Sequence, residues 1–249
     1  MIKKIEHNQT SLQSKPESRG SYWLGGLIQT TDTLFPSGGY AHSYGLEEQV
    51  SLGLIRTKEQ LEEFLIREIL PILERLELPY LRYCYTSAEK QDCRNLLELN
   101  EEISSWKMTK EIRNAGMSQG SQMLRMIREI YQCDFSQNFE QILIRNNSTC
   151  QQITATALLR KAQQSPLEPT LIAWVYQAVS NFCSASIKLL RLGEVACQKM
   201  IHRCMTQQNL DKTISGSLEI KRDEAGFFNP VLDIASARHE LAFSRLFIS

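Results

Sequence analysis

The sequence lacks the short motifs that mark most catalytic and metal-binding proteins. It contains no Gly-x-x-x-x-Gly-Lys-Ser/Thr run, so we expect no nucleotide-hydrolysing site of its own. Its seven cysteines form no Cys-x-x-Cys pair and its four histidines no His-x-x-x-His pair, so no local chelate is predicted. An odd number of cysteines without a secretory signal indicates reduced thiols, and we expect a cytoplasmic protein.

An excess of charge is also missing. Lys plus Arg and Asp plus Glu each total 28, which gives a formal net charge of zero. This balance argues against binding of nucleic acid or of an acidic membrane surface. The most apolar early stretch, 22–28, is too short to cross a bilayer, so no membrane association is expected. A neutral surface is prone to association, which favours a protein that works with partners.

Sustained alternation of apolar and polar residues is absent as well, which argues against a sheet. We predict an all-α, single-domain helical bundle of roughly eight to ten helices over residues 21–249, after a flexible tail at 1–20. Residues 209–229 are expected to form a mobile connection to a helix that runs from Pro230 to the end of the sequence.

Two long helical patterns support this prediction. Thr57 and Gln60 have the spacing of a capping box before the first, in which Pro71 should kink or end the helix. The second pattern runs from about 96 to 131 as one helix. It contains Gly116 and Gly120, each of which costs roughly 1 kcal/mol relative to alanine in a helix interior. Their presence predicts close approach of another backbone.

A dense group of special residues precedes these helices, between Asp32 and Glu47. His42 beside Ser43, with Asp32 upstream, offers the ingredients of nucleophilic catalysis. Neighbouring side chains rarely adopt that geometry, so the alternative is that His42 and Asp32 cap turns whose shape the proline and glycines set. Both interpretations stay open at this point. The residues of this scaffold motif are Asp32, Pro36, Gly38, Gly39, His42, Ser43, Tyr44, Gly45 and Glu47.

One face of a later helix carries sulfur atoms at Cys197, Met200 and Cys204. These could be soft metal ligands, but three small or flexible apolar side chains are more typical of a core. We therefore assign no metal ligand.

Four segments resemble the signature blocks of the urease accessory protein UreF family. They are Pro36-Ser-Gly-Gly-Tyr-Ala-His-Ser-Tyr-Gly-Leu-Glu47, Arg113-Asn-Ala-Gly-Met-Ser-Gln-Gly120, Ala185-Ser-Ile-Lys-Leu-Leu-Arg-Leu-Gly-Glu194, and the final stretch from Pro230 to Ser249. The blocks follow the family's order. In the third, Lys188 stands where the family usually has arginine, Arg191 where it has proline and Glu194 where it has glutamine.

The resemblance implies an all-helical homodimer that is a scaffold and not an enzyme. It would bind the accessory protein UreD, also called UreH, and recruit the GTPase UreG to regulate nickel insertion into apo-urease. Nickel would be handled by the complex, with no cofactor in this chain. The alternative is a metallochaperone that carries nickel itself.

Three sets of residues follow from these interpretations. The partner-binding set is Arg238, His239, Glu240, Phe243, Arg245, Leu246 and Phe247. The helix-crossing or dimer face is Arg113, Ala115, Gly116, Gln119 and Gly120. Lys188 and Arg191 are the possible GTPase contacts.

Overall fold

The computed structural model describes residues 22–32, 34–36, 43–240 and 245–247. All regular secondary structure in these residues is helical, and no strand is present among them. This confirms the all-α prediction. Thirteen α-helical segments lie in the described residues, but α3, α4 and α5 belong to one continuous rod, so the separate helices there number eleven. This is more than the eight to ten predicted, and one expected helix, 96–131, is divided into two.

Consecutive helical turns form one continuous rod from Lys58 to Glu89. It consists of α3 (Lys58–Phe64), α4 (Leu70–Ile72) and α5 (Leu78–Glu89), joined by π-helical turns at Leu65–Ile69 and Leu73–Glu77. The predicted capping box starts it, with the Gln60 amide donating to Thr57 and the Gln60 side chain accepting from the Thr57 amide. Pro71 was predicted to kink or end this helix, and the helical turns continue past it.

The π-helical turns explain how the rod continues past its prolines. A proline removes one backbone donor and crowds the preceding turn, and a wider turn relieves that crowding. The second proline, Pro79, cannot donate to the carbonyl of Arg75. That carbonyl instead accepts a hydrogen bond of 3.0 Å from the Gly226 amide. The helix is therefore completed by a segment far away in sequence.

The predicted helix from 96 to 131 is two helices, α6 (Cys93–Trp106) and α7 (Lys110–Ile130). The break at 107–109 is held by long-range contacts. Lys107 Nζ lies 2.7 Å from Glu77 Oε1, and the Trp106 indole donates to the Tyr80 hydroxyl at 3.0 Å. Periodicity alone could not reveal this interruption.

Both glycines of α7 face the segment that leads into α9 (Gln152–Ala162). A Cβ at Gly120 would lie 2.1 Å from the Cys150 carbonyl oxygen, and one at Gly116 would lie 2.3 Å from Gln151 Oε1. The close approach predicted from the glycines is thus made by the same chain. Ala115 and Gln119, on the same helix, are buried too.

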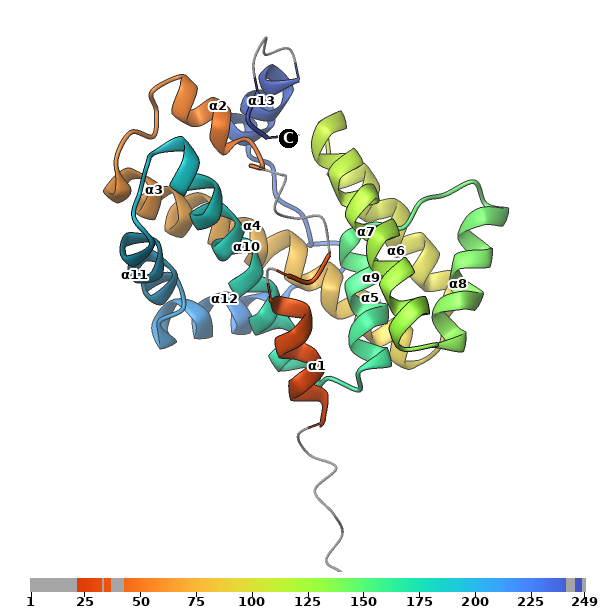
Figure 1. Ribbon diagram of the computed structural model, residues 1–249. Coiled ribbons are helices and arrows are strands. Elements are labelled where there is room, and N and C mark those ends of the chain that lie inside the picture. Colours follow the sequence, from red (N-terminus) through yellow and green to blue (C-terminus); the bar gives the residue numbers. More distant parts are fainter. Residues whose placement is uncertain (1–21, 33, 37–42, 241–244, 248–249) are drawn as a thin grey trace, which may run out of the picture.

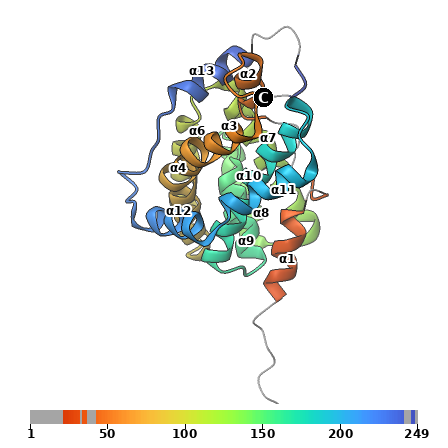
Figure 2. The same ribbon diagram turned by 90° about the vertical axis from the view of Figure 1, so that its left-hand side faces the viewer.

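Seven further helices complete the described part of the fold (Figure 1). They are α1 (Tyr22–Thr31), α2 (Leu46–Ser51), α8 (Asp134–Arg145), α10 (Leu167–Leu189), α11 (Glu194–Cys204), α12 (Gln207–Glu219) and α13 (Pro230–His239). Cys197, Met200 and Cys204 are buried in the apolar cluster, as the core interpretation predicted. In both ribbon views α1 lies at one end of the molecule, with α2 and α13 side by side at the other (Figures 1 and 2).

The C-terminal region differs from the prediction in two ways. Part of the expected connection 209–229 lies in α12, so its residues up to Glu219 are helical. The last helix ends at His239, and residues 245–247 are not helical. The predicted tail at 1–20 lies outside the described residues.

Candidate partner-docking site

The segments that carry the sequence motifs meet at the end of the molecule formed by α2 and α13 (Figure 1). Glu47 comes from the start of α2, Glu111 from the start of α7 and His239 from the end of α13. The short segment 245–247 closes the group. We call Glu47, Glu111 and His239 the His239 clasp.

His239 sits at the centre of the clasp and is 1% exposed. Its Nε2 lies 3.1 Å from Glu47 Oε2, and its Nδ1 lies 2.8 Å from Glu111 Oε2. Both carboxylate side chains are themselves nearly buried, at 13% and 10% exposure. The membership of His239 in the partner-binding set stays a prediction, and in this chain its ring lies between the two carboxylates.

The two carboxylates hold residues 245–247. Glu47 accepts hydrogen bonds from the Leu246 amide at 2.7 Å and the Phe247 amide at 3.0 Å. Glu111 Oε1 accepts from Arg245 Nη1 at 2.8 Å. Phe247 is buried and lies under Lys188, whose Nζ is 5.7 Å from the ring centroid. Leu246, in contrast, is 68% exposed.

Exposed groups surround the clasp on α13. Val231 and Ile234 lie one helical turn apart, and both are more than half exposed. Arg238 Nε lies 2.8 Å from Glu48 Oε1, and Lys110 pairs with Glu240 at 3.7 Å. Apolar side chains flanked by charged ones are typical of a surface that binds another protein.

Val231, Ile234 and Glu111 were not among the residues predicted from the sequence. The first two could have been found from the helical pattern, since they lie off the face of α13 that buries Leu232, Ala235 and His239. Glu111 carries no local signal, because its role depends on a histidine 128 positions away.

The scaffold motif is described only in part. Gly38, Gly39 and His42 lie outside the described residues, as does Phe243. The hypothesis of catalysis by Asp32, His42 and Ser43 therefore remains a prediction. Asp32 accepts from the Leu34 amide at 2.7 Å, and Pro36 follows that turn.

The described end of the motif has a left-handed backbone that leads into α2. Tyr44 and Gly45 have φ angles of 52° and 84°. The Tyr44 hydroxyl accepts from Gln119 Nε2 at 2.9 Å, which joins the first motif segment to the second. Burial raises the pKa of Tyr44 to about 12, so this hydroxyl keeps its proton. Ser43, also buried, lies beside this turn.

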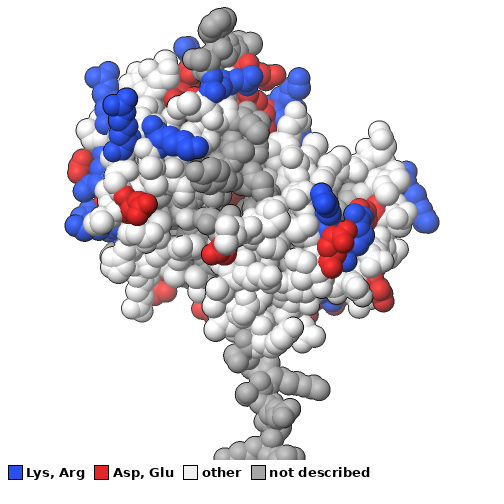
Figure 3. All heavy atoms as spheres, viewed as in Figure 1, with Lys and Arg blue, Asp and Glu red and all other residues white. Residues whose placement is uncertain are grey.

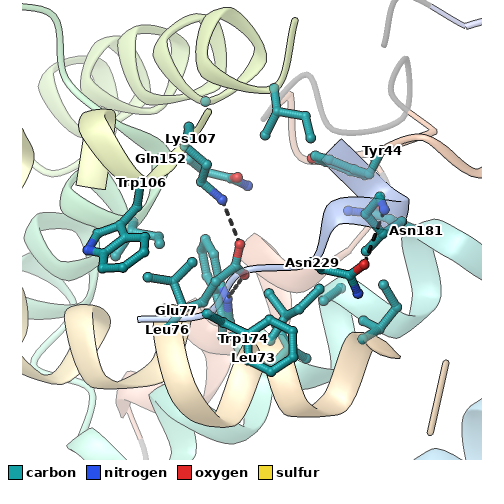
Figure 4. A pocket seen from close by; sticks show the side chains of 18 of the residues that line it. Tyr44, Leu73, Leu76, Glu77, Trp106, Lys107, Gln152, Trp174, Asn181 and Asn229 are labelled. Atoms are coloured by element: carbon teal, nitrogen blue, oxygen red, sulfur yellow. Dashed lines mark hydrogen bonds and ion pairs between the residues drawn. The ribbon is translucent and has the colours of Figure 1, made fainter. Parts of the chain in front are cut away.

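Tyr44 also borders a cavity of about 150 Å³ between α7, α10 and the rod (Figure 4). Trp106, Trp174 and Leu73 give it a largely apolar wall. Lys107 and Glu77 form the ion pair drawn there, and Trp174 Nε1 donates to Glu77 Oε2 at 2.9 Å. Leu232 and Asp233 of α13 also line this cavity.

The structure keeps the other predicted residues near this end. Arg113 donates to the Lys107 carbonyl at 3.0 Å, so it supports the break between α6 and α7. Arg191 follows α10 and adopts a positive φ of 54°. Figure 3 shows basic side chains gathered over the part of the surface near α2 and the end of α10.

No three histidine, cysteine, aspartate or glutamate side chains in the described part of the chain gather as a group able to hold a metal ion. None of the described helices has both the length and the apolar character needed to cross a membrane.

The fold and the surface are those of an all-helical protein with an exposed apolar face held beside a buried charge cluster. Comparison with known families gives a match to the UreF model over residues 55–205, and the chain belongs to the UreF family.

Curated relatives cover nearly the whole sequence. The protein named urease accessory protein UreF in Marinomonas sp. (strain MWYL1) is 26% identical to this chain, over 90% of this chain and 93% of its own length. The protein of that name in Pseudoalteromonas translucida (strain TAC 125) is 27% identical over 95% of this chain and 98% of its own length. The one in Nostoc sp. (strain PCC 7120 / SAG 25.82 / UTEX 2576) is 26% identical over 90% and 94%.

Proposed function

We propose that this protein acts in urease maturation as a non-catalytic scaffold. In this role it joins UreD, also called UreH, to the GTPase UreG and regulates GTP-dependent nickel insertion into apo-urease. Membership of the UreF family and the names of its relatives support the maturation role. The proposal includes a cytoplasmic homodimer that carries no cofactor of its own.

The observation that carries the docking part of the proposal is the surface of α13 and residues 245–247. Val231, Ile234 and Leu246 are exposed by 56%, 60% and 68%. Glu47 of the His239 clasp holds the backbone at Leu246, and Val231 and Ile234 lie on the helix that carries His239. Binding energy at protein interfaces is concentrated in a few anchors that lose water on binding, and exposed apolar groups on a fixed backbone suit that role. We assign this surface to UreD.

UreG would meet a different part of the same end. Lys188 and Arg191 lie at the end of α10, where Figure 3 shows basic side chains gathered. Basic groups at a rim affect association rate and salt dependence more than final affinity. A contact with UreG through these residues would therefore weaken as salt rises.

Co-expression of this chain with UreD and UreG tests the scaffold role. The variant Val231→Glu with Ile234→Glu places two charges on the proposed docking surface without disturbing the core. Val195→Glu is the matched control, since Val195 is 70% exposed on α11. We expect the α13 variant to lose UreD from the purified complex and the control to retain it. Equal retention of UreD by both variants would refute the docking surface.

The alternative of nickel carriage by this chain is tested separately, by equilibrium dialysis of the purified protein against Ni²⁺. We expect no tight stoichiometric binding. The absence of a metal-holding group applies only to the described residues, so His42 and its neighbours are tested by this experiment too. Tight binding by the isolated chain would favour the metallochaperone alternative.

A further inference from the structure

The hydrogen bonds of His239 determine its protonation state. A neutral imidazole has one N–H group, and its other nitrogen is an acceptor. Here both nitrogens lie within hydrogen-bond distance of carboxylate oxygens, at 3.1 Å and 2.8 Å. With a neutral ring, one nitrogen lone pair would face a carboxylate oxygen inside the protein. Only the imidazolium form donates to both.

A proton on one of the carboxyl groups would also remove the conflict, but the contacts oppose it. Glu47 accepts two backbone amides, and Glu111 accepts the Arg245 guanidinium. Hydrogen bonds of these kinds favour the charged carboxylate. Imidazole is also the stronger base of the two groups. The proton therefore belongs on His239.

The charges of the clasp and of Arg245, whose side chain is 40% exposed, then balance. His239 and Arg245 supply two positive charges, and Glu47 and Glu111 supply two negative ones. Loss of the His239 proton leaves two carboxylates, 13% and 10% exposed, on either side of a neutral buried ring, and such an uncompensated charge is costly.

Other charged groups around the clasp are already engaged with one another or face the rim. On α2, Glu48 pairs with Arg238, and on α7, Lys110 pairs with Glu240. From α10, Lys188 lies over Phe247. Asp233 lies earlier on α13 beside the cavity, where burial raises the pKa of its carboxyl. None of these is placed between the two carboxylates.

We propose that the His239 imidazolium is the positioning residue of the docking surface: it fixes Glu47 and Glu111, which in turn hold residues 245–247. UreD binding therefore depends on the protonation of His239, and the surface loosens as pH rises and the ring loses its proton. This inference rests on the proposed docking function, although the control of residues 245–247 by His239 is independent of it.

The first experiment uses the isolated full chain. Nitrogen-15 NMR of the histidine rings across pH 6 to 9 reports protonation, and heteronuclear relaxation of the Leu246 and Phe247 amides reports their motion. We expect a doubly protonated His239 ring at the acidic end, with increased motion of both amides as that ring titrates. A neutral His239 ring beside rigid amides at pH 6 would overturn the inference.

The second experiment measures UreD affinity as a function of pH for wild type, His239→Gln and the control His202→Gln, whose histidine is exposed on α11. We expect His239→Gln to bind about tenfold more weakly at pH 6.5, in line with the loss of a charge-assisted hydrogen bond. Wild-type and control affinity should fall with pH, and that of His239→Gln should not.

Circular dichroism at each pH establishes that His239→Gln remains folded. If the variant unfolds, the wild-type NMR titration still decides the inference, because it needs no substitution. Increased motion of residues 245–247 with unchanged UreD affinity would refute the docking function of this segment and leave its control by His239 intact. A pH-independent wild-type affinity together with rigid amides would refute both.

Discussion

The contact between α7 and α9 and the clasp beside α13 join distant parts of the chain by opposite means. The first is fixed by shape, because Gly120 leaves no room for a Cβ beside the Cys150 carbonyl. The second is fixed by charge, because a buried histidine lies between two carboxylates. A steric contact does not respond to pH, whereas a clasp that depends on a proton can be loosened by changing the pH.

Arg160 gives a second comparison with the clasp, because it is a buried cation on α9, one of the two helices whose contact is fixed by shape. It is 1% exposed, and its guanidinium donates to the Thr30 hydroxyl and, at 2.7 Å, to Gln163 Oε1. No carboxylate pairs with it among the described residues. Burial lowers its pKa to about 10, which still leaves it charged at neutral pH. This cation joins α1 to α9 and has no titration in the physiological range.

The largest effect is expected from Arg160→Ala. Removal of the side chain leaves a cavity and deprives Thr30 and Gln163 of a donor, so the free energy of unfolding should fall by about 3 to 4 kcal/mol. Denaturant unfolding measures this, with the exposed Arg125→Ala as control, for which a change within about 0.5 kcal/mol is expected. A small loss for both would show that the buried cation is not needed for the fold.

Gly120→Ala should come next, with a loss of about 2 kcal/mol. The new methyl group would have to displace the backbone at Cys150, and such overpacking outweighs the gain in helix propensity. Gly25→Ala on α1 is the matched control, because nothing lies within 4 Å of its Cβ position. We expect the control to be neutral or stabilising by up to about 1 kcal/mol. Equal effects of the two substitutions would contradict the close approach.

Glu47→Gln tests the region fixed by charge and should have a local effect of about 1 to 2 kcal/mol. The amides of Leu246 and Phe247 lose their charged acceptor, so their hydrogen exchange at one fixed pH should accelerate while that of core amides is unchanged. Glu48→Gln is the comparison, since Glu48 contacts Arg238 and not residues 245–247. Identical exchange of the Leu246 and Phe247 amides in the two variants would show that Glu47 does not hold residues 245–247.

The smallest effect concerns acid. Hydrogen bonds from Arg222 lower the pKa of the Glu102 carboxyl. The stabilisation from this pair is therefore present above the carboxyl's unfolded-state pKa and is lost as pH falls through the lower folded value. Thermal unfolding at pH 7 and pH 4 should differ less in Glu102→Gln than in wild type. Glu219→Gln, a substitution at an exposed residue, should leave the difference between the two pH values unaltered. If Glu102→Gln and Glu219→Gln show the same difference, the pair of Glu102 and Arg222 does not contribute to the acid response.

The sequence predicted the features that depend on neighbouring residues. The capping box of Thr57 and Gln60 involves four consecutive positions, and the cost of glycine in a helix is a property of the residue itself. Both predictions agree with the structure. The all-α class was predictable for the same reason, since it requires only local periodicity.

The failures occurred where distant contacts decide the local structure. The break at 107–109 contains neither glycine nor proline, and it depends on Lys107 reaching Glu77. The rod was not predicted to continue beyond Pro71, and past Pro79 the Gly226 amide donates to the carbonyl of Arg75. The partner-binding set of Arg238, His239, Glu240, Phe243, Arg245, Leu246 and Phe247 stays a prediction. The sequence did not reveal that Glu47 and Glu111 contact His239 and residues 245–247, because no local pattern connects them.

The sequence separations within the clasp also bear on how the protein is made. Glu47 bonds to the amides of Leu246 and Phe247, which lie 199 and 200 positions later. A ribosome adds residues in order, at roughly 5 to 20 per second. The helices of the core can therefore associate while Glu47 still lacks the amides that donate to it, and the docking surface is completed only after residue 247 has been synthesised and released. A chain interrupted before residue 247 could fold most of its core without presenting the docking surface. Translation itself would therefore delay assembly with a partner until residue 247 has been added.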